Sequence, residues 1–371
     1  MLRLEEASWP PRLSPAERGV LLRAAEQPAA KATEELEETL AGVVGASHAV
    51  AFNSCTSAIH ACAAMLGPIR DVRTLAPGFT FAGSWTGPAH LGHIPMFTDV
   101  DGSTWNISSN RVRALEREVD IVIAVDLHGV PHDVPRTNVG GRTVITDACQ
   151  SLGSELAGRQ VGGEGLHCWS FSSAKAVPSF AGGAVTVEDA DLAGQLRALR
   201  DYGIDGSGPR AAEPCIVPFG HNWRITGPDA ALAAFRLREA SAGRWWIDRM
   251  WSIGEELRLS ASALGFTVQS RLADARPAWH KVRVGWRGAP LEQVGTSLTK
   301  HGVPWHRWGL PLDEVFPWAM RGARPPLPMS RLVASTTLCL STEERPFWTW
   351  NDREVSDTIR ALGRAAEEMD R

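Results

Sequence analysis

Short apolar runs alternate with segments of helical periodicity along the first two hundred residues. Four runs predict strands, at 49–53, 94–100, 121–125 and 143–146. The run at 121–125 is continuous and mostly β-branched, as expected for a strand buried on both faces. Between the runs, apolar residues recur every three or four positions, which predicts amphipathic helices. This alternation predicts an α/β fold with a mostly parallel central sheet, whose ligands bind at the carboxyl ends of the strands.

The pattern changes in the second half of the chain. A long helical pattern covers 228–264, with Gly243 and Gly254 as possible breaks. A strand pattern at 279–286 and helical patterns at 291–302 and 353–366 follow. We therefore predict a large α/β domain over residues 1–240, which begins with a helical segment, and a small C-terminal α+β domain over residues 241–371.

Composition and charge restrict the classes of function. The 371 residues are 44% apolar and 22% charged, as in an ordinary globular protein. A net charge of −4 gives no reason to expect binding to nucleic acid or to a membrane surface. The acidic start is unlike a signal peptide, and no apolar run approaches the roughly 20 residues of a membrane span. The six cysteines form no C-x-x-C pair, which predicts free thiols in a reducing, cytoplasmic compartment.

Small polar residues stand at the ends of two predicted strands. Ser54, Thr56 and Ser57 lie where the first strand passes into a helix, so several main-chain N–H groups meet there. Such a helix start suits a phosphate group, although a plain N-cap has the same residues. Asp147 directly follows the strand at 143–146, where it is either a cap or a ligand-binding group. We expect these groups to converge at one edge of the sheet.

Lys175 is one of only four lysines, and it lies among small and apolar residues. A lysine in such surroundings loses hydration, which lowers its pKa and leaves a nucleophilic amine. That amine can form a Schiff base with a carbonyl compound or with pyridoxal phosphate (PLP). The alternative is a loop lysine whose ammonium group lies in water.

Six segments, in chain order, resemble the DegT/StrS family of PLP-dependent sugar aminotransferases, which have the fold type I architecture. The resemblance covers most of the chain. The segments are, with the family pattern in parentheses, Ser54-Cys55-Thr56-Ser57-Ala58 (S-G-T-x-A), Pro77-Gly78-Phe79-Thr80-Phe81 (P-x-x-T-[FW]), Phe97-Thr98-Asp99-Val100-Asp101 (V-D-V-D), Asp147-Ala148-Cys149-Gln150-Ser151 (D-A-A-Q/H-x), Trp169-Ser170-Phe171-Ser172-Ser173-Ala174-Lys175 (F-S-F-x-x-x-K) and Gly220-His221-Asn222-Trp223-Arg224 (G-Y-N-Y-R).

The resemblance implies that PLP is the cofactor and gives each residue a role. Lys175 would carry PLP as a Schiff base and later move the proton at the substrate's α-carbon. Asp147 would keep the pyridine nitrogen protonated, so that the ring can act as an electron sink. The other implied contacts are Gln150 on the phenolic oxygen or the ring face, Phe81 stacked on the ring, Thr56, Ser57 and Ser170 on the phosphate, and Asn222 on the phosphate of the neighbouring subunit's PLP. Such shared active sites imply a homodimer.

The chain departs from the family pattern mainly on the substrate side. Cys55 replaces the glycine of S-G-T, so the turn is preserved only if Cys55 has a negative φ. Ala181 stands where the family has an acidic residue. His128, His221 and Trp223 replace tyrosines. Because the cofactor residues match while the substrate residues do not, we expect PLP chemistry on an unusual substrate.

We therefore expect an aminotransferase that moves an amino group from glutamate or glutamine to a keto group of a sugar, a cyclitol or a related natural-product intermediate. An alternative is another PLP reaction on the same scaffold, such as elimination, decarboxylation or cyclisation. A third hypothesis is a non-catalytic binding protein, but the presence of Lys175, Asp147 and Asn222 argues against it. His90 and His93 could share a helix face, but the sequence offers no third metal ligand. We therefore expect no metal site.

Overall fold

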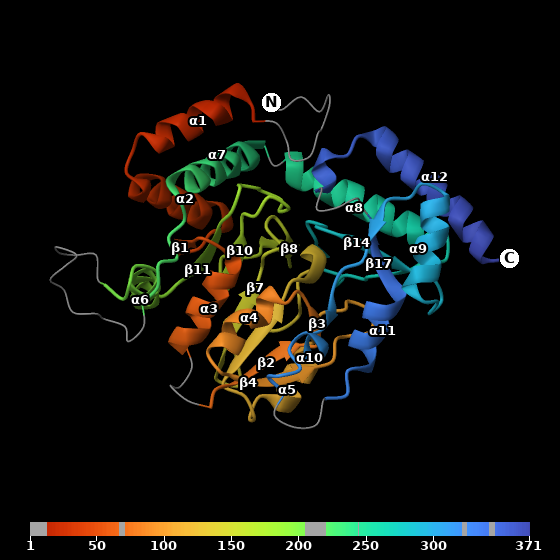
Figure 1. Cartoon of the computed structure of the whole chain (residues 1–371), viewed down its shortest axis with the longest axis horizontal. Helices are drawn as coiled ribbons and strands as arrows, with labels where there is room; N and C mark the ends of the chain where they lie inside the picture. Colours follow the sequence, from red (N-terminus) through yellow and green to blue (C-terminus); the bar gives the residue numbers. More distant parts are fainter. Residues whose placement is uncertain (1–12, 67–70, 205–219, 244, 321–324, 341–345) are drawn as a thin grey trace.

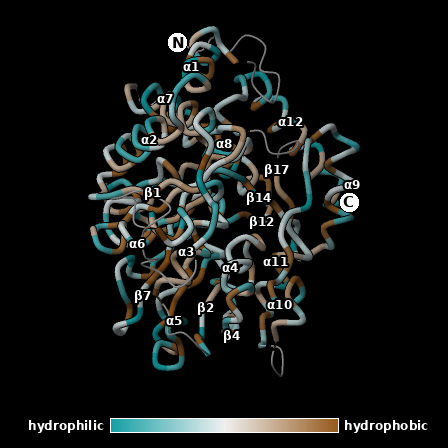
Figure 2. Tube along the Cα trace, turned by 60° about the vertical axis from the view of Figure 1, so that its left-hand side comes forward, coloured by the Kyte–Doolittle hydropathy of each residue, from teal (hydrophilic) through white to brown (hydrophobic). Residues whose placement is uncertain are grey.

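Helices cover both faces of a central sheet, and a second, smaller sheet lies beside it (Figure 1). The computed structural model describes residues 13–66, 71–204, 220–243, 245–320, 325–340 and 346–371. Hydrophobic segments concentrate on the inner strands, while hydrophilic residues gather on the outer helices (Figure 2).

Seven strands of the central sheet follow in the order β1-β11-β10-β7-β5-β2-β4 within the described residues. Strands β10, β7, β5, β2 and β4 are parallel, whereas β11 is antiparallel to both of its neighbours. This arrangement confirms the predicted mainly parallel sheet. The bounds are β1 His48–Phe52, β11 Gly183–Val187, β10 Leu166–Ser170, β7 Arg142–Asp147, β5 Ile121–Val125, β2 Arg73–Pro77 and β4 Ile94–Thr98, and the short β6, Asn138–Val139, pairs with β7.

Alternate residues of β1 face two different layers of helices. Val50 and Phe52 pack into the core that contains α3, α4 and α6, whereas Ala49 and Ala51 pack into the core that contains α2 and α7. This period of two is the geometry of a strand buried on both faces. The helices of these layers are α1 Pro15–Ala25, α2 Ala29–Val44, α3 Cys55–Leu66, α4 Gly83–His90, α5 Ser109–Leu115, α6 Ala190–Arg200 and α7 Gly227–Gly243.

The second sheet has the order β12-β14-β17-β15, and every pair in it is antiparallel. Its core is shared with α8, α9 and α12. The bounds are β12 Thr267–Val268, β14 Val282–Gly285, β15 Trp305–His306, β17 Thr337–Leu340, α8 Trp245–Ala263, α9 Leu291–Lys300 and α12 Asp352–Met369. The remaining short elements are β8 Glu155–Leu156, β9 Arg159–Gln160, β13 Ala275–Arg276, α10 Leu312–Val315, α11 Pro328–Thr336 and the 3-10 turns Leu127–Gly129 and Phe347–Thr349.

The late part of the chain also reaches back to the first sheet. Strand β16 (Leu310–Pro311) pairs with β3 (Phe79–Thr80), and Leu312 and Phe316 join the core around α3. The proposed domain boundary near residue 240 therefore stays a prediction, because residues from the C-terminal segment belong to both cores.

The predicted helix over 228–264 is two helices, α7 and α8, which are separated near Gly243. Gly254 does not break α8. A Cβ atom at Gly254 would lie 2.2 Å from the Cβ of Trp279, so glycine allows the helix to pack closely on that indole. Trp279 itself precedes β14, and the strand predicted at 279–286 is correspondingly shorter.

The possible histidine pair of the sequence does not share a helix face. Helix α4 ends at His90, while His93 lies beyond it and its Nδ1 is 2.9 Å from the hydroxyl of Thr74. The described residues contain no group of three side chains that could hold a metal ion. Within the same residues, no helix is long and apolar enough to cross a membrane. The described cysteines are free thiols, as predicted, and Cys215 lies outside the described residues.

The buried His167 makes the stability of the fold depend on pH. Its Nε2 lies 3.3 Å from Arg136 Nη1, and arginine can only donate, so Nε2 accepts in a neutral ring. Burial and the charge of Arg136 lower the pKa of His167 from 6.5 to about 3. The unfolded chain therefore binds more protons than the folded one as the pH falls below 6.5, and stability is lost between that pH and the folded pKa.

We expect the free energy of unfolding to fall as the pH is lowered from 7 to 5, and the His167→Phe variant to show a smaller pH slope. The slope should decrease by up to about 1.4 kcal/mol per pH unit, because one titrating group is removed. Denaturant unfolding at several pH values measures both slopes. Equal slopes for the two proteins would contradict the assignment of a depressed pKa to His167.

Candidate active site

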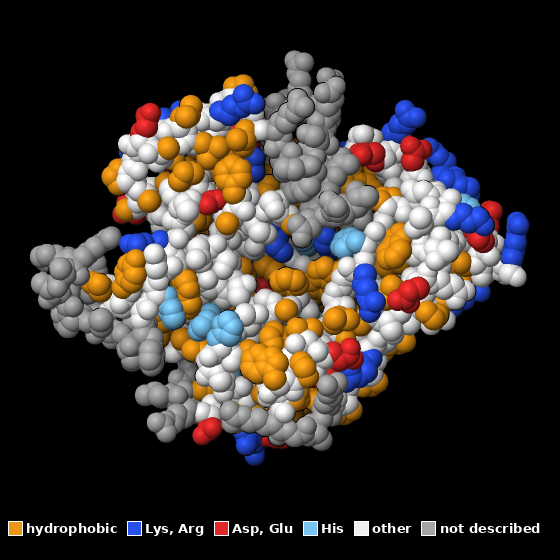
Figure 3. Space-filling view, viewed as in Figure 1, with side chains coloured by type: hydrophobic (Ala, Val, Ile, Leu, Met, Phe, Trp, Pro, Cys, Tyr) orange, Lys and Arg blue, Asp and Glu red, His pale blue; other side chains and the backbone are white. Residues whose placement is uncertain are grey.

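The predicted site residues gather at the carboxyl end of the central sheet. Asp147 is the last residue of β7, Ser170 is the last residue of β10, and α3 begins three residues after β1. On the face shown in Figure 3 a depression opens between the two sheets, where hydrophobic side chains surround cationic and histidine side chains. The convergence predicted from strand ends is therefore present.

The start of α3 is built around Ser54. The hydroxyl of Ser54 accepts from the main-chain N–H of Ser57 at 3.1 Å, and its carbonyl accepts from the N–H of Ala58. The first N–H groups of a helix have no partner within the helix, so those of Cys55 and Thr56 suit an anion. Cys55 is the first residue of α3 and is not among the residues with positive φ, so it meets the condition set by the sequence.

Gly183 allows the helix start to approach the sheet. A Cβ atom at this position would lie 2.3 Å from the nitrogen of Cys55 and 2.3 Å from the carbonyl carbon of Ser54. Both neighbours are main-chain atoms that cannot turn away. Only glycine therefore fits at position 183 without moving the start of α3.

Thr56 and Phe81 lie on either side of one small space. A Cβ atom at Gly83 would be 3.1 Å from Thr56 Oγ1 and 3.0 Å from Phe81 Cδ1. Phe81 is 57% exposed, which argues against the alternative of an ordinary core residue. Its ring is nearly parallel to that of Trp308, with 6.4 Å between the centroids and 21° between the planes.

Two donors fix the carboxylate of Asp147. Ser84, from the first turn of α4, donates to Oδ2 at 2.6 Å, and the N–H of Cys149 donates to Oδ1 at 3.1 Å. The hydroxyl of Thr80 lies 3.0 Å from that of Ser84, so Thr80, Ser84 and Asp147 form one series of hydrogen bonds. Asp147 is buried and acts partly as a strand-end cap, as the alternative held, but its carboxylate is also held at the site.

The main chain of His128 fixes the side chain of Gln150. Gln150 Oε1 accepts from the N–H of His128 at 2.6 Å, which leaves the NH₂ group of Gln150 as the end that can donate elsewhere. His128 has φ 59°, a conformation that histidine adopts more readily than most residues. Its carbonyl accepts from the N–H of His280 at 2.8 Å.

The tautomer of His128 follows from its neighbours. Gln269 donates through Nε2 to the carbonyls of Thr104 and Leu127, so its oxygen faces His128 Nδ1 at 2.7 Å. An oxygen can only accept, so Nδ1 carries the hydrogen and Nε2 is an acceptor. Burial and the charge of Arg283 lower the pKa of His128, which keeps the ring neutral. This Nε2 is buried without a hydrogen-bond partner among the described residues.

Lys175 lies half-buried in the loop after β10. Its main-chain N–H donates to the carbonyl of Ser172 at 3.0 Å, and the next carbonyl, that of Ala176, accepts from the indole of Trp348 at 3.1 Å. The charge of Lys175, after burial, lowers the pKa of His280, and it also acts on Cys55. The charge of Lys175 therefore acts both on Cys55 at the start of α3 and on His280.

Ser170 lies beside the loop of Lys175, whereas Asn222 is exposed. The hydroxyl of Ser170 accepts from the N–H of Ser172 at 3.4 Å, beside the loop of Lys175. Asn222 is exposed, and among the described residues its side chain accepts from Arg224 and its main chain pairs with Asp201. An exposed Asn222 is compatible with a role in a neighbouring subunit.

Several residues of the site escaped the sequence analysis. Ser84, Gln269 and His280 carry no local motif and reach the site only through tertiary contacts. Arg283 was also missed, but its guanidinium is buried and donates to Thr337 Oγ1, to the carbonyls of Trp308, Val333 and Thr337, and to the sulfur of Cys339. The bond to the carbonyl of Trp308 fixes the main chain of this residue beside the site.

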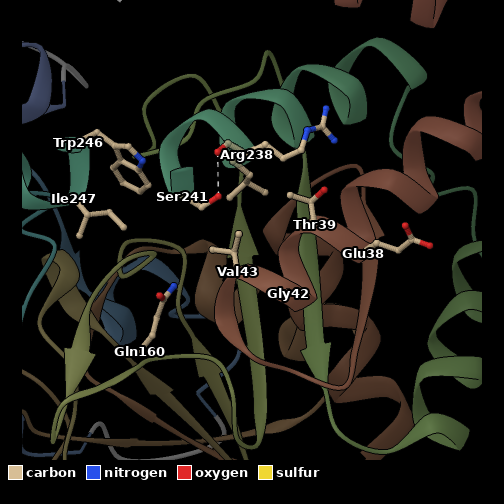
Figure 4. Close-up of a pocket in the computed structure, with 10 residues that line it drawn as sticks. Glu38, Thr39, Gly42, Val43, Gln160, Arg238, Ser241, Trp246 and Ile247 are labelled. Atoms are coloured by element: carbon tan, nitrogen blue, oxygen red, sulfur yellow. Dashed lines mark hydrogen bonds between the residues drawn. The ribbon is translucent and has the colours of Figure 1, made fainter. Parts of the chain in front are cut away.

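A separate groove lies between α2, α7 and the start of α8 (Figure 4). Its volume is about 580 Å³, and it mixes polar side chains such as Thr39 and Arg238 with apolar ones such as Val43 and Trp246. None of the residues predicted for the site lines it. The candidate active site at the strand ends and this groove are therefore two separate places on the molecule.

Comparison with known proteins gives a family and a fold. The model of the DegT/DnrJ/EryC1/StrS aminotransferase family matches residues 22–345. Protein MosB of Rhizobium meliloti is 26% identical over 275 residues, which are 69% of this chain and 54% of MosB. The chain spans about half the length of this curated relative.

Solved structures agree in fold over almost the whole chain. The crystal structure of 3-amino-5-hydroxybenzoic acid synthase has a TM-score of 0.83 and 21% identity, and the match covers 98% of this chain and 99% of the other. DesV of S. venezuelae has a TM-score of 0.79 and 21% identity, with 95% and 94% covered. The fold type I architecture is thereby confirmed.

We expect Gly183→Ala to weaken the binding of PLP about tenfold or more, because the added methyl group pushes the start of α3 away from the sheet and overpacking costs roughly 1–3 kcal/mol. Titration with PLP, followed by absorbance, measures the affinity. Gly194→Ala in α6 is the matched control, since a Cβ there meets nothing within 4 Å. An unchanged affinity in a folded Gly183→Ala protein would contradict this role of the close approach.

Proposed function

Because the chain belongs to the DegT/DnrJ/EryC1/StrS aminotransferase family, we propose that it moves an amino group from glutamate or glutamine to a keto group of a sugar, a cyclitol or a related biosynthetic intermediate. PLP is the cofactor of this family. The observation that carries the proposal is that Asp147, the start of α3 and the loop of Lys175 after β10 all follow strands that end at the same edge of the sheet.

The residues present fit this cofactor. The main-chain N–H groups of Cys55 and Thr56 and the hydroxyls of Thr56 and Ser57 would hold the phosphate, with Ser170 beside them. Thr56 and Phe81 both lie close to Gly83, where an added Cβ would approach both side chains. Phe81 would stack on the flat ring of PLP, an offset aromatic contact.

Bound PLP supplies an aldehyde for amines and a ring that accepts electrons from the α-carbon. The carboxylate of Asp147, held by Ser84 and the N–H of Cys149, would face the pyridine nitrogen and keep its proton there. Gln150 would donate to the phenolic oxygen through its free NH₂ group. Lys175 would hold the aldehyde of PLP, and its amine is the group that would move the proton at the substrate's α-carbon.

The side proposed for the substrate presents neutral histidines and an aromatic ring beside the buried Arg283. His128 offers an acceptor at Nε2, and its ring lies edge-on to Trp308 at 5.0 Å. His280 is buried with Nδ1 unpartnered among the described residues, and burial and Lys175 lower its pKa. These groups suit a substrate that is recognised by hydrogen bonds and stacking.

The protein would work as a homodimer in the cytoplasm, without nucleic-acid or membrane partners. Exposed Asn222 would complete the phosphate site of the neighbouring subunit. The free thiols fit a reducing compartment.

The first test is an absorbance experiment with purified protein and PLP. We expect a visible band that converts to the pyridoxamine form when glutamate or glutamine is added. Lys175→Ala should lose both the band and the conversion, because it removes the amine that would hold the aldehyde of PLP, whereas Lys300→Ala removes only a surface ion pair with Glu368 and should behave as wild type. A stable band that ignores both donors would favour elimination, decarboxylation or cyclisation, and absence of a band would overturn the cofactor assignment.

Mixed dimers test the shared site. Lys175→Ala and Asn222→Ala subunits should each be inactive, but after mixing and reassembly about a quarter of the wild-type sites should recover, because half of the dimers are hybrids and each has one intact site. Conversion of the bound cofactor by the amino donor measures the recovery. If Asn222 served its own subunit, mixing would restore nothing.

A further inference from the structure

The groove between α2, α7 and the start of α8 contains two buried donors without a partner among the described residues. They are the indole Nε1 of Trp246 and the amide Nε2 of Gln160. Trp246 as a whole is only 5% exposed. Figure 4 shows the polar ends of both side chains turned toward the other residues that line the groove. Because an unpaired buried donor costs free energy, such groups are uncommon and indicate a missing acceptor.

The other polar side chains of the groove already have partners on the neighbouring helices. The hydroxyl of Thr39 donates to the carbonyl of Glu35 at 2.6 Å, and the hydroxyl of Ser241 donates to the carbonyl of Arg238 at 3.0 Å. The guanidinium of Arg238 pairs with the carboxylate of Glu35. Among the lining side chains, the donors that stay available are therefore the indole and the amide.

Apolar side chains form much of the remaining surface of the groove. Val43, Leu237 and Ile247 line it together with the ring of Trp246. Gly42 leaves open space in α2, since a Cβ atom there would meet nothing within 4 Å. The volume of about 580 Å³ is within the range of pockets that bind small molecules. An apolar body can therefore lie next to the two donors.

The surface beside the donors is fixed by packing. Trp246 and Ile247 belong to the core that α2 and α7 share. A Cβ atom at Gly153 would lie 2.8 Å from Cγ1 of Ile247, so the isoleucine packs directly on the main chain of that glycine. A preformed surface lowers the cost of ordering side chains when a ligand binds.

The charges at the rim restrict the charge of the ligand. Glu38 is exposed, and Arg238 is already paired with Glu35. A ligand with several negative charges would be repelled by Glu38. A cation could pair with Glu38, but it would leave both buried donors without an acceptor. The groove therefore favours a neutral or singly charged ligand with an acceptor oxygen.

We propose that this groove is a binding site for a small molecule that has an apolar body and a carboxylate or carbonyl oxygen. The oxygen accepts from the indole of Trp246 and from the amide of Gln160, and the body packs on Val43 and Ile247. The groove is separate from the strand ends, so this inference does not rest on the proposed function.

Benzoate and benzylamine are the probes, because they share a ring and differ in the group that hydrogen-bonds. They are titrated at neutral pH into the full chain, incubated with PLP, whose indole nitrogens carry ¹⁵N. We expect benzoate to shift the indole N–H signal of Trp246, which is assigned by its absence in Trp246→Phe. The indole of Trp279 already donates to Glu255 at 3.0 Å, so its signal should stay in place. Benzylamine should bind about tenfold more weakly than benzoate or worse, since it brings no acceptor.

Two glycine variants test where the probe binds, with affinity measured by calorimetry. Gly42→Leu places a side chain in the groove and should weaken benzoate about tenfold or more. Gly194→Leu, on the exposed side of α6 where a Cβ atom also meets nothing within 4 Å, should bind as wild type. Trp246→Phe keeps an aromatic ring without the donor and should weaken benzoate about tenfold.

An unmoved Trp246 signal would overturn the proposal, as would equal binding of benzylamine or full affinity for benzoate in Gly42→Leu. None of these measurements depends on catalysis. A protein that shows the shift of Trp246 but no visible PLP band would contradict the proposed function and leave the groove site standing.

Discussion

The site depends on one close approach of two main-chain segments. The Cα of Gly183 lies so near the first peptide of α3 that any side chain would collide with Ser54 and Cys55. The approach fixes the helix start against β11, next to β10 and β7, and so sets where main-chain N–H groups point. Because those N–H groups cannot turn independently, an anion bound there would be held by the main chain rather than by mobile side chains. The polar chemistry of the other residues is arranged around this fixed point.

Hydrogen bonds then fix the orientations of the side chains at the ends of the strands. Ser84 joins α4 to the end of β7 through Asp147, while Gln269 fixes the tautomer of His128, whose N–H in turn orients Gln150. Each link leaves one defined group facing the site, a carboxylate, an acceptor nitrogen or an amide NH₂. Buried networks of this kind are specific because every misplaced partner leaves an unsatisfied polar atom.

The sequence predicted those features that depend on local order. A continuous apolar run such as 121–125 can be satisfied only as a doubly buried strand, and a polar residue directly after a strand, such as Asp147, is bound to lie at the sheet edge. The antiparallel β11 and the two-residue pairing of β16 with β3 have no periodic signal. Ser84 and Gln269 were missed for the same reason: their partners are 63 and 141 residues away, and only tertiary packing brings them into contact.

The charges of the substrate side restrict how a carboxylate can be recognised. The guanidinium carbon of Arg283 lies 6.0 Å from the ring centroid of Trp308, but its N–H groups already donate to main-chain carbonyls, to Thr337 and to a sulfur. Using it for an amino donor would break several buried hydrogen bonds at once, which costs more than one ion pair returns. In a dimer with shared sites, Arg224 would arrive together with Asn222, to which it already donates at 3.2 Å. In a shared site, Arg224 of one subunit would therefore supply the positive charge for the other subunit, whose own Arg283 is already used by hydrogen bonds in the core.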